Sequence, residues 1–380
     1  MLSRLRFFFV IFATILAWAT AAPVLARDGS AGSIVATTPL AGAPDGAAAY
    51  RIHYRSADTR GQSVVVTAAV LVPRGRAPAF GRDVVVWAHG ASGVAENCGL
   101  SDKPGLYDQV AGLRALLAAG YVVVAPDYEG LGNPGPHPFL VGIASAHSVI
   151  DAVRAARAMP TTRASSRYAL FGESLGGFSV LWAASEASRY APELQLVGVA
   201  AAAPPTDLKA NLTGGTNAAV RAFLTAYTAS SWEKIYAVPL TTVVRPRTAA
   251  LIRALAKNCV TLDGFKLRTK IGMLRLAGQL KNVDLGATPR WAALMRQNSV
   301  DPSRLNVPIF VAQGSADAIV APQVTRAFVQ KLCSRERKVQ FMAIEGGDHV
   351  SVGKRSADVV VEWIGKRFAG EPAPSNCGKN

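Results

Sequence analysis

The segment Gly172-Glu173-Ser174-Leu175-Gly176 places a serine between two glycines in the pattern G-x-S-x-G. It follows a short apolar run and precedes a long stretch of helical character. At a tight turn from strand to helix, a serine is held above the sheet in strained backbone geometry, and glycines two residues away leave room for it. Because the helix N-terminus also favours negative charge, this pattern predicts that Ser174 is a nucleophile.

A serine hydroxyl is too weakly acidic to attack without a base, and the chain has five histidines. One of them, His349, follows the last apolar run of the chain in Glu345-Gly346-Gly347-Asp348-His349. Of the five histidines, it is the one that comes after the serine in the sequence and lies in a loop at the carboxyl end of a strand. The general base that accompanies a serine in this kind of turn occupies such a position. We therefore predict His349 as the general base.

The acid that orients the base is expected between these two residues in the chain, after another strand. Asp317, in Gln313-Gly314-Ser315-Ala316-Asp317, fits that position. A carboxylate there would fix the imidazole tautomer and stabilise the imidazolium. Asp348 is the alternative candidate for this acid, but it is adjacent to His349 in the same loop, so its carboxylate is poorly placed to contact the imidazole ring.

The oxyanion formed during acyl transfer needs hydrogen-bond donors. We expect one donor to be the backbone N–H of Leu175, which follows the nucleophile. The other should come from the loop His89-Gly90-Ala91-Ser92-Gly93, with Ala91 as the first choice and Ser92 as an alternative. We expect His89 to shape this loop rather than to take part in the chemistry.

Apolar runs alternate with helix-length stretches along the chain, and several runs are rich in valine without polar alternation. This pattern is typical of a mainly parallel sheet covered by helices on both faces. The first two strands have a short link and should form an antiparallel hairpin. We predict eight strands, at residues 50–55, 64–72, 84–88, 121–125, 168–171, 196–201, 308–312 and 339–344, and helices at 107–119, 146–159, 175–189, 323–332 and 357–368.

Residues 204–306 interrupt the alternation with helical patterns and turn residues, and this stretch is too long for a simple loop. We interpret it as a helical lid inserted after the sixth strand. The domain plan is then a core in two parts, residues 27–203 and 307–380, with the lid between them.

The first 26 residues have the features of a signal peptide: Arg4 and Arg6, an apolar run over 7–17, and small residues before a cleavage point after Ala26. The apolar run is shorter than the roughly 20 residues of a membrane-spanning helix, and no later segment is long and apolar enough to span. We therefore expect a secreted or periplasmic protein without a transmembrane segment after signal removal.

Four cysteines remain, an even number that suggests two disulfides in an exported chain. Sequence alone allows three pairings. We predict Cys98–Cys259, which would join the lid to the region after the oxyanion loop, and Cys333–Cys377, which would hold the Pro-rich tail. The spacing of the cysteines fits no metal motif, and we expect no cofactor or metal.

Positive charge is concentrated in the predicted lid. The whole chain has a formal charge of +16, and residues 205–306 hold 15 Lys or Arg against 5 Asp or Glu. This charge indicates either contact with an anionic lipid interface or simply a solvated surface. Because no recognition motif accompanies it, we expect no nucleic-acid partner.

Several segments together resemble the secretory lipase family: the Ser174 turn, APDYEGLG at 125–132, PGPHP at 134–138, SVIDAVR at 148–154, and VGVAA at 197–201 through Asp207. The resemblance runs from about Val84 to the C-terminus. It implies an α/β-hydrolase fold with a helical lid after the sixth strand, carboxylic esters of small molecules or lipids as substrates, and the triad of Ser174, Asp317 and His349 inferred above.

The sequence leaves two other classes of function open, a different acyl-transfer enzyme and a protein without catalytic activity. A peptidase or an acyltransferase would use the same residues, since the acceptor decides the outcome. A hydrolase fold that serves only as a binding module is also conceivable, although the intact triad argues against it. A comparison of ester and peptide hydrolysis separates an esterase from a peptidase, and a fluorophosphonate label separates active from inactive protein.

Overall fold

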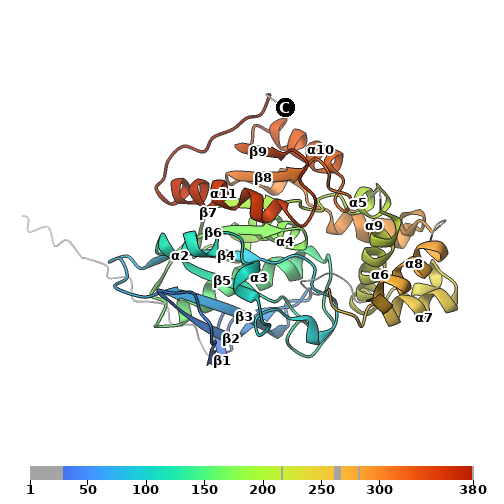
Figure 1. Cartoon of the computed structure of the whole chain (residues 1–380), viewed down its shortest axis with the longest axis horizontal. Helices are drawn as coiled ribbons and strands as arrows, with labels where there is room; N and C mark the ends of the chain where they lie inside the picture. Colours follow the sequence, from blue (N-terminus) through green and yellow to red (C-terminus); the bar gives the residue numbers. More distant parts are fainter. Residues whose placement is uncertain (1–28, 215–216, 261–266, 281–282, 379–380) are drawn as a thin grey trace, which may run out of the picture.

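The computed structural model describes residues 29–214, 217–260, 267–280 and 283–378. In this part of the chain a single sheet of nine strands has the order β1-β2-β3-β5-β4-β6-β7-β8-β9 (Figure 1). The strands are β1 Ile34–Pro39, β2 Ala47–Ala57, β3 Ser63–Pro73, β4 Arg82–Ala88, β5 Val122–Pro126, β6 Ala164–Glu173, β7 Gln195–Ala202, β8 Ile309–Gly314 and β9 Val339–Ile344.

The strands from β4 to β9 pair in parallel, and β1, β2 and β3 pair antiparallel at one side of the sheet. The predicted hairpin is therefore confirmed as β2 and β3. The central strands are buried on both faces, as β5 with its run of three valines illustrates. Such strands are continuous in apolar residues because helices cover both sides of them.

The prediction of eight strands was wrong, because β1 adds a ninth within the described residues. This strand pairs with β2 at the outer edge of the sheet, and its residues after Ile34 are exposed. The strand has the sequence IVATTP, in which Val35 is exposed and the residues after it are Ala, Thr and Pro, so no alternation of buried and exposed side chains marks it in the sequence.

Helices cover both faces of the sheet. On one face α3, α4 and α10 pack on the strands, and on the other α2 and α11 do so, each face with its own apolar core. Outside the region between β7 and β8, the helices are α1 Leu106–Gln109, α2 Leu113–Ala118, α3 Gly142–Ala158, α4 Leu175–Tyr190, α10 Pro322–Cys333, α11 Val352–Phe368 and the 3-10 helix η1 Glu96–Cys98.

The helix predicted over 107–119 is two short helices, because Gly112 between them has a left-handed φ of 72°. A Cβ on Gly112 would lie 2.8 Å from Val361 Cγ2 of α11. The close approach of α11 thus requires glycine there and divides the helix.

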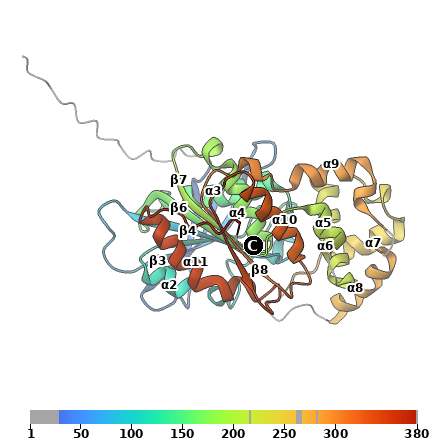
Figure 2. The same ribbon diagram turned by 90° about the horizontal axis from the view of Figure 1, so that it is seen from above.

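Between β7 and β8 the described chain is helical. These helices gather beside the core at one end of the molecule (Figures 1 and 2). They are α5 Leu208–Gly214, α6 Ala218–Ile235, α7 Pro246–Leu255, α8 Leu267–Leu280 and α9 Pro289–Asn298, with 3-10 helices η2 Leu240–Thr242, η3 Leu285–Ala287 and η4 Pro302–Arg304. We refer to this helical group as the insertion.

The predicted signal peptide lies outside the described residues. Among the helices that the structure does describe, none combines the length and the apolar character needed to cross a bilayer.

Candidate active site

Ser174 occupies the turn between β6 and α4 with φ 53° and ψ −119°, a strained conformation for a residue with a side chain. Its backbone N–H donates to Ala202 O of β7 at 2.8 Å, which ties the turn to the sheet. A Cβ on Gly172 would lie 2.3 Å from Gly176 O, and a Cβ on Gly176 would lie 1.8 Å from Ala88 O. Both glycines are therefore required sterically, as the sequence pattern predicted.

His349 lies in the loop after β9 and joins the other two predicted residues. Its Nε2 is 2.8 Å from Ser174 Oγ, and its Nδ1 is 2.8 Å from Asp317 Oδ2. The carboxylate favours the tautomer with the proton on Nδ1, which leaves the Nε2 lone pair to accept the serine proton. The side chain of His349 is 10% exposed and that of Asp317 is fully buried, so this hydrogen-bonded chain is shielded from water.

Asp317 is held in place by groups beyond His349. Its Oδ1 accepts the backbone N–H groups of Ile319 and Val320 at 2.9 Å each, and its Oδ2 accepts Gln313 Nε2 at 3.0 Å. Burial opposes ionisation of the carboxyl, but the hydrogen bond and charge of His349, with the two backbone donors, bring the pKa of Asp317 below its usual value. Asp317 is therefore ionised at neutral pH.

Gln313 is the residue that sequence reasoning missed. It is the penultimate residue of β8 and is itself fixed, because its Oε1 accepts a hydrogen bond from Thr325 Oγ1 of α10 at 2.7 Å. A buried glutamine at the carboxyl end of a strand, four residues before the predicted acid, was the signal that could have found it. The rival acid Asp348 is exposed and accepts the N–H of Ser351 at 3.0 Å, so it stabilises the turn rather than contacting His349.

Both predicted oxyanion donors lie beside Ser174. Ala91 and Leu175 line a cavity together with Ser174, and a Cβ placed on Gly90 would be in van der Waals contact with Ser174 Cβ, at 3.6 Å. Ser92, the alternative to Ala91, does not line this cavity. The cavity is about 30 Å³, which is room for about one water molecule.

The remaining walls of the cavity are largely apolar. They come from the loop before α3, from the insertion and from the loop after Asp317: Phe139, Leu140, Pro205, Leu208, Asn211, Leu212, Leu224, Ile319 and Val320. Helices α5 and α6 of the insertion thus lie over Ser174. This cover leaves no space for an acyl chain in the present conformation.

His89 and His137 are buried and have structural contacts. His89 Nδ1 is 2.6 Å from Gly90 O, and its backbone carbonyl accepts Tyr128 OH at 2.8 Å. His137 Nδ1 is 2.7 Å from Glu129 O, and burial lowers the pKa of His137 to about 4. Both imidazoles are held within the loops beside the site, as expected for His89.

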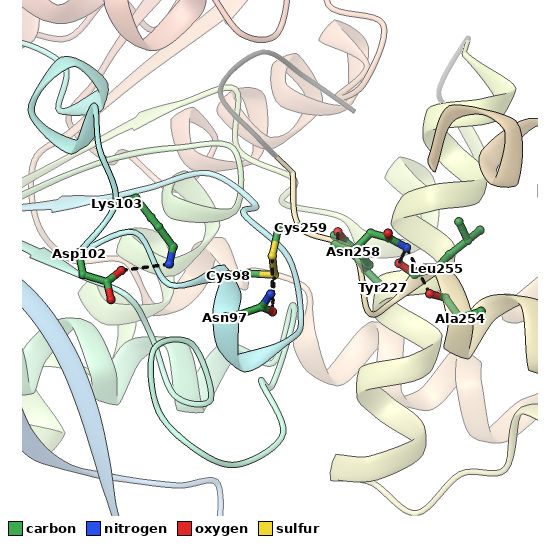
Figure 3. Close-up of a disulfide and its surroundings, with 9 residues drawn as sticks. All are labelled: Asn97, Cys98, Asp102, Lys103, Tyr227, Ala254, Leu255, Asn258 and Cys259. Carbon is green, nitrogen blue, oxygen red and sulfur yellow. Dashed lines mark hydrogen bonds and ion pairs between the residues drawn. A yellow bond between two sulfur atoms is a disulfide. The ribbon is translucent and has the colours of Figure 1, made fainter. Parts of the chain in front are cut away.

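The disulfide Cys98–Cys259 joins the insertion to the region next to the oxyanion loop (Figure 3). Gly93 packs directly on this bond, since a Cβ there would lie 2.4 Å from Cys98 Sγ. One residue further, Val260 N donates to Ser92 O at 2.8 Å. The insertion is therefore attached to the loop that carries Ala91 by a hydrogen bond, and to Cys98 shortly after that loop by a covalent bond.

The second disulfide is Cys333–Cys377, so both predicted pairings are confirmed. Next to it, the Asn376 side chain exchanges two hydrogen bonds of 2.8 Å with the backbone of Phe341 in β9. These contacts hold the C-terminal tail on the edge of the sheet. Within the described residues, no cluster of three or more His, Cys, Asp or Glu side chains could hold a metal ion.

The family model of the secretory lipases matches residues 107–376. Lipase A of Arthroderma benhamiae is 26% identical over 362 residues, which cover 88% of this chain and 73% of that protein. A probable inactive lipase of Mycobacterium tuberculosis is 24% identical over 269 residues, 68% of this chain and 58% of that protein.

Among solved structures, Candida antarctica lipase A in its closed state has a TM-score of 0.74 at 18% identity, covering 92% of this chain and 85% of that one. This likeness shows that the fold is the expected α/β-hydrolase architecture. The match of the family model extends over most of the chain and includes Ser174, Asp317 and His349. The chain belongs to the secretory lipase family and is a hydrolase of the lipase and esterase type.

Proposed function

We propose that this protein hydrolyses carboxylic esters through an acyl-enzyme formed on Ser174. The observation that carries the proposal is the unbroken hydrogen-bonded chain from Ser174 Oγ through His349 to Asp317, with 2.8 Å at each step. A nucleophile, a base and an orienting carboxylate at these distances form the arrangement that activates a serine for acyl transfer.

In the proposed reaction, Ser174 Oγ forms a bond to the ester carbonyl carbon while its proton passes to His349 Nε2. The backbone N–H groups of Leu175 and Ala91 stabilise the negative oxygen of the tetrahedral intermediate. When this intermediate collapses, the bond to the alcohol oxygen breaks and His349 gives its proton to the leaving alcohol. His349 then takes a proton from a water molecule while the water oxygen forms a bond to the carbonyl carbon of the acyl-enzyme. When this second tetrahedral intermediate collapses, the bond to Ser174 Oγ breaks, His349 returns its proton to Ser174 Oγ, and the carboxylic acid is released.

The apolar lining of the cavity supports an acyl group as the bound part of the substrate. Since a cavity of about 30 Å³ cannot hold an acyl chain, we propose that α5 and α6 act as a lid that moves aside when substrate enters. Rates on p-nitrophenyl esters from acetate to palmitate test this point. A lid that opens onto a long apolar site gives higher kcat/KM on longer chains. A lid that opens only far enough to expose Ser174 gives activity on acetate and little on longer chains, and a site that stays closed gives no activity on any of these esters.

The excess of positive charge in residues 205–306 supports contact of the insertion with an anionic lipid interface. Activity on anionic emulsions should then fall with added salt more steeply than activity on neutral emulsions. Two disulfides and membership of a secretory family support an extracellular or periplasmic location.

The test of the proposed function is the turnover of p-nitrophenyl butyrate by Ser174→Ala and His349→Ala. Each variant should lose on the order of 10⁴-fold or more in kcat, because the two residues act as a unit. Circular dichroism shows whether the variants keep the native fold. A folded Ser174→Ala protein with near-normal turnover would end the proposal, and hydrolysis of peptides in preference to esters would favour a peptidase.

A further inference from the structure

Helix α8 of the insertion exposes three large apolar side chains on one face. Leu267 is 74% exposed, Ile271 44% and Leu274 65%. Their spacing of four and three residues places them in one stripe along the helix. Among the described residues, the other exposed large apolar side chains, such as Phe80 in the loop before β4, are not arranged in this way.

The opposite face of α8 holds the helix in the insertion. Thr269, Met273 and Leu276 are buried, and the helix packs on α6 and α7. These buried residues follow each other at spacings of four and three, so they share one face. Each lies two residues after a residue of the exposed stripe, about 200° around the helix, which places the buried face opposite the stripe. The stripe is therefore not needed for the packing of α8, and in Figures 1 and 2 this helix lies at the end of the molecule away from the sheet.

Basic residues flank the stripe. Lys270 and Arg275 are both exposed, and successive turns of the helix place one on each side of the apolar residues. The sequence of α8, LRTKIGMLRLAGQL, contains no acidic residue. A helix with an apolar stripe between cationic borders lies in the plane of a membrane interface, with its apolar face in the acyl boundary and its cations at the headgroups.

We propose that the exposed face of α8, made of Leu267, Lys270, Ile271, Leu274 and Arg275, docks on the surface of an anionic lipid layer. A second copy of the chain is a poor occupant, because the face would bring its own cations against identical cations. Charge complementarity instead favours a surface that offers both anionic headgroups and an apolar interior. None of these five residues lines the cavity at Ser174, so the docking face would hold the protein at the interface without forming part of the acyl site.

Vesicle binding tests the proposal in the Ser174→Ala background, where substrate lipid is not consumed. The probes are phosphatidylcholine vesicles with and without phosphatidylglycerol, and binding is measured by co-sedimentation. Ile271→Ser/Leu274→Ser should weaken binding to the mixed vesicles by about tenfold or more. Lys270→Gln/Arg275→Gln should remove the preference for phosphatidylglycerol. Phe80→Ser, which removes a 95% exposed apolar side chain elsewhere, is the matched control and should bind like the parent.

The inference builds on the proposed lipid ester substrate, and its failure can be told apart from a failure of catalysis. In the active background, the α8 variants should keep parental kcat/KM on the soluble ester p-nitrophenyl acetate. Binding of both α8 variants at parental affinity would overturn the docking face while leaving the catalytic proposal intact. Parent protein that binds neither kind of vesicle would overturn it as well, and a protein partner would then be the remaining occupant.

Discussion

Removing the disulfide Cys98–Cys259 should lower both the stability of the protein and its kcat, whereas removing Cys333–Cys377 should lower the stability alone. The first bond joins residues 161 apart in sequence and the second joins residues 44 apart. Chain entropy of the unfolded state then gives stabilisations of about 5 and about 4 kcal/mol, respectively. The two bonds therefore differ by about 1 kcal/mol in this model, and stability alone hardly separates the two variants.

Catalysis should separate them, because only the first bond lies beside the oxyanion loop. Gly93 packs against Cys98 Sγ, and the adjacent Ser92 carbonyl accepts a hydrogen bond from Val260. Loss of the bond should loosen the loop that presents the Ala91 N–H. Since loss of a complete oxyanion donor costs 10²–10³-fold in kcat, a loosened donor should cost about tenfold.

The assay compares Cys98→Ala/Cys259→Ala with Cys333→Ala/Cys377→Ala. Urea unfolding gives the stability of each protein, and kcat on p-nitrophenyl butyrate is measured well below both unfolding midpoints. We expect similar losses of stability, a drop in kcat for the first variant and parental kcat for the second. Equal kcat values in the two variants would refute the reasoning that the insertion holds the oxyanion loop in place.

Three further changes test the site. Asp317→Asn should lower kcat by about 10⁴-fold, because the imidazole is then held in the wrong tautomer, and a loss below tenfold would argue against Asp317 as the orienting acid. Gln313→Leu removes one hydrogen-bond donor to Asp317 and the hydrogen-bond acceptor of Thr325. We expect kcat to fall by about tenfold while KM stays unchanged. A change in KM alone would contradict this positioning role. Burial raises the pKa of Glu173 to about 7, against the opposing charges of His349 and Lys354, so Glu173 is neutral at pH 6 and ionised at pH 8. An ionised Glu173 stabilises the imidazolium of His349, and glutamine cannot do so. The ratio of kcat/KM for Glu173→Gln to kcat/KM for the parent should therefore fall between pH 6 and pH 8. A ratio that stays constant would show that the charge of Glu173 does not act on His349.

The convergence of Ser174, Asp317 and His349 could be predicted because each follows a buried strand of a parallel sheet. The carboxyl ends of such strands meet at one edge of the sheet, so a position in sequence becomes a position in space. The disulfides were predictable for a related reason, since each pairs a cysteine of the core with a segment that needs an anchor.

Other features depend on contacts that no local pattern carries. Strand β1 has exposed Ala and Thr and is defined by its pairing with β2. The break at Gly112 is imposed by the approach of α11. The hydrogen bond of Gln313 to Asp317 and the exposed stripe of α8 likewise depend on which other parts of the chain pack against these residues in the folded protein. Apolar residues in a helix predict a buried face, and they do not reveal that a second apolar face remains uncovered.

The central claim is that Ser174 is the residue acylated during ester hydrolysis, and covalent labelling tests it most directly. Active protein is treated with a fluorophosphonate, and the labelled site is mapped by peptide mass spectrometry while residual activity on p-nitrophenyl butyrate is followed. We expect one adduct per chain, on Ser174, with activity lost in proportion to labelling and a much slower reaction in His349→Ala. Full inactivation with the adduct on another residue, or undiminished activity in protein fully labelled at Ser174, would contradict the claim.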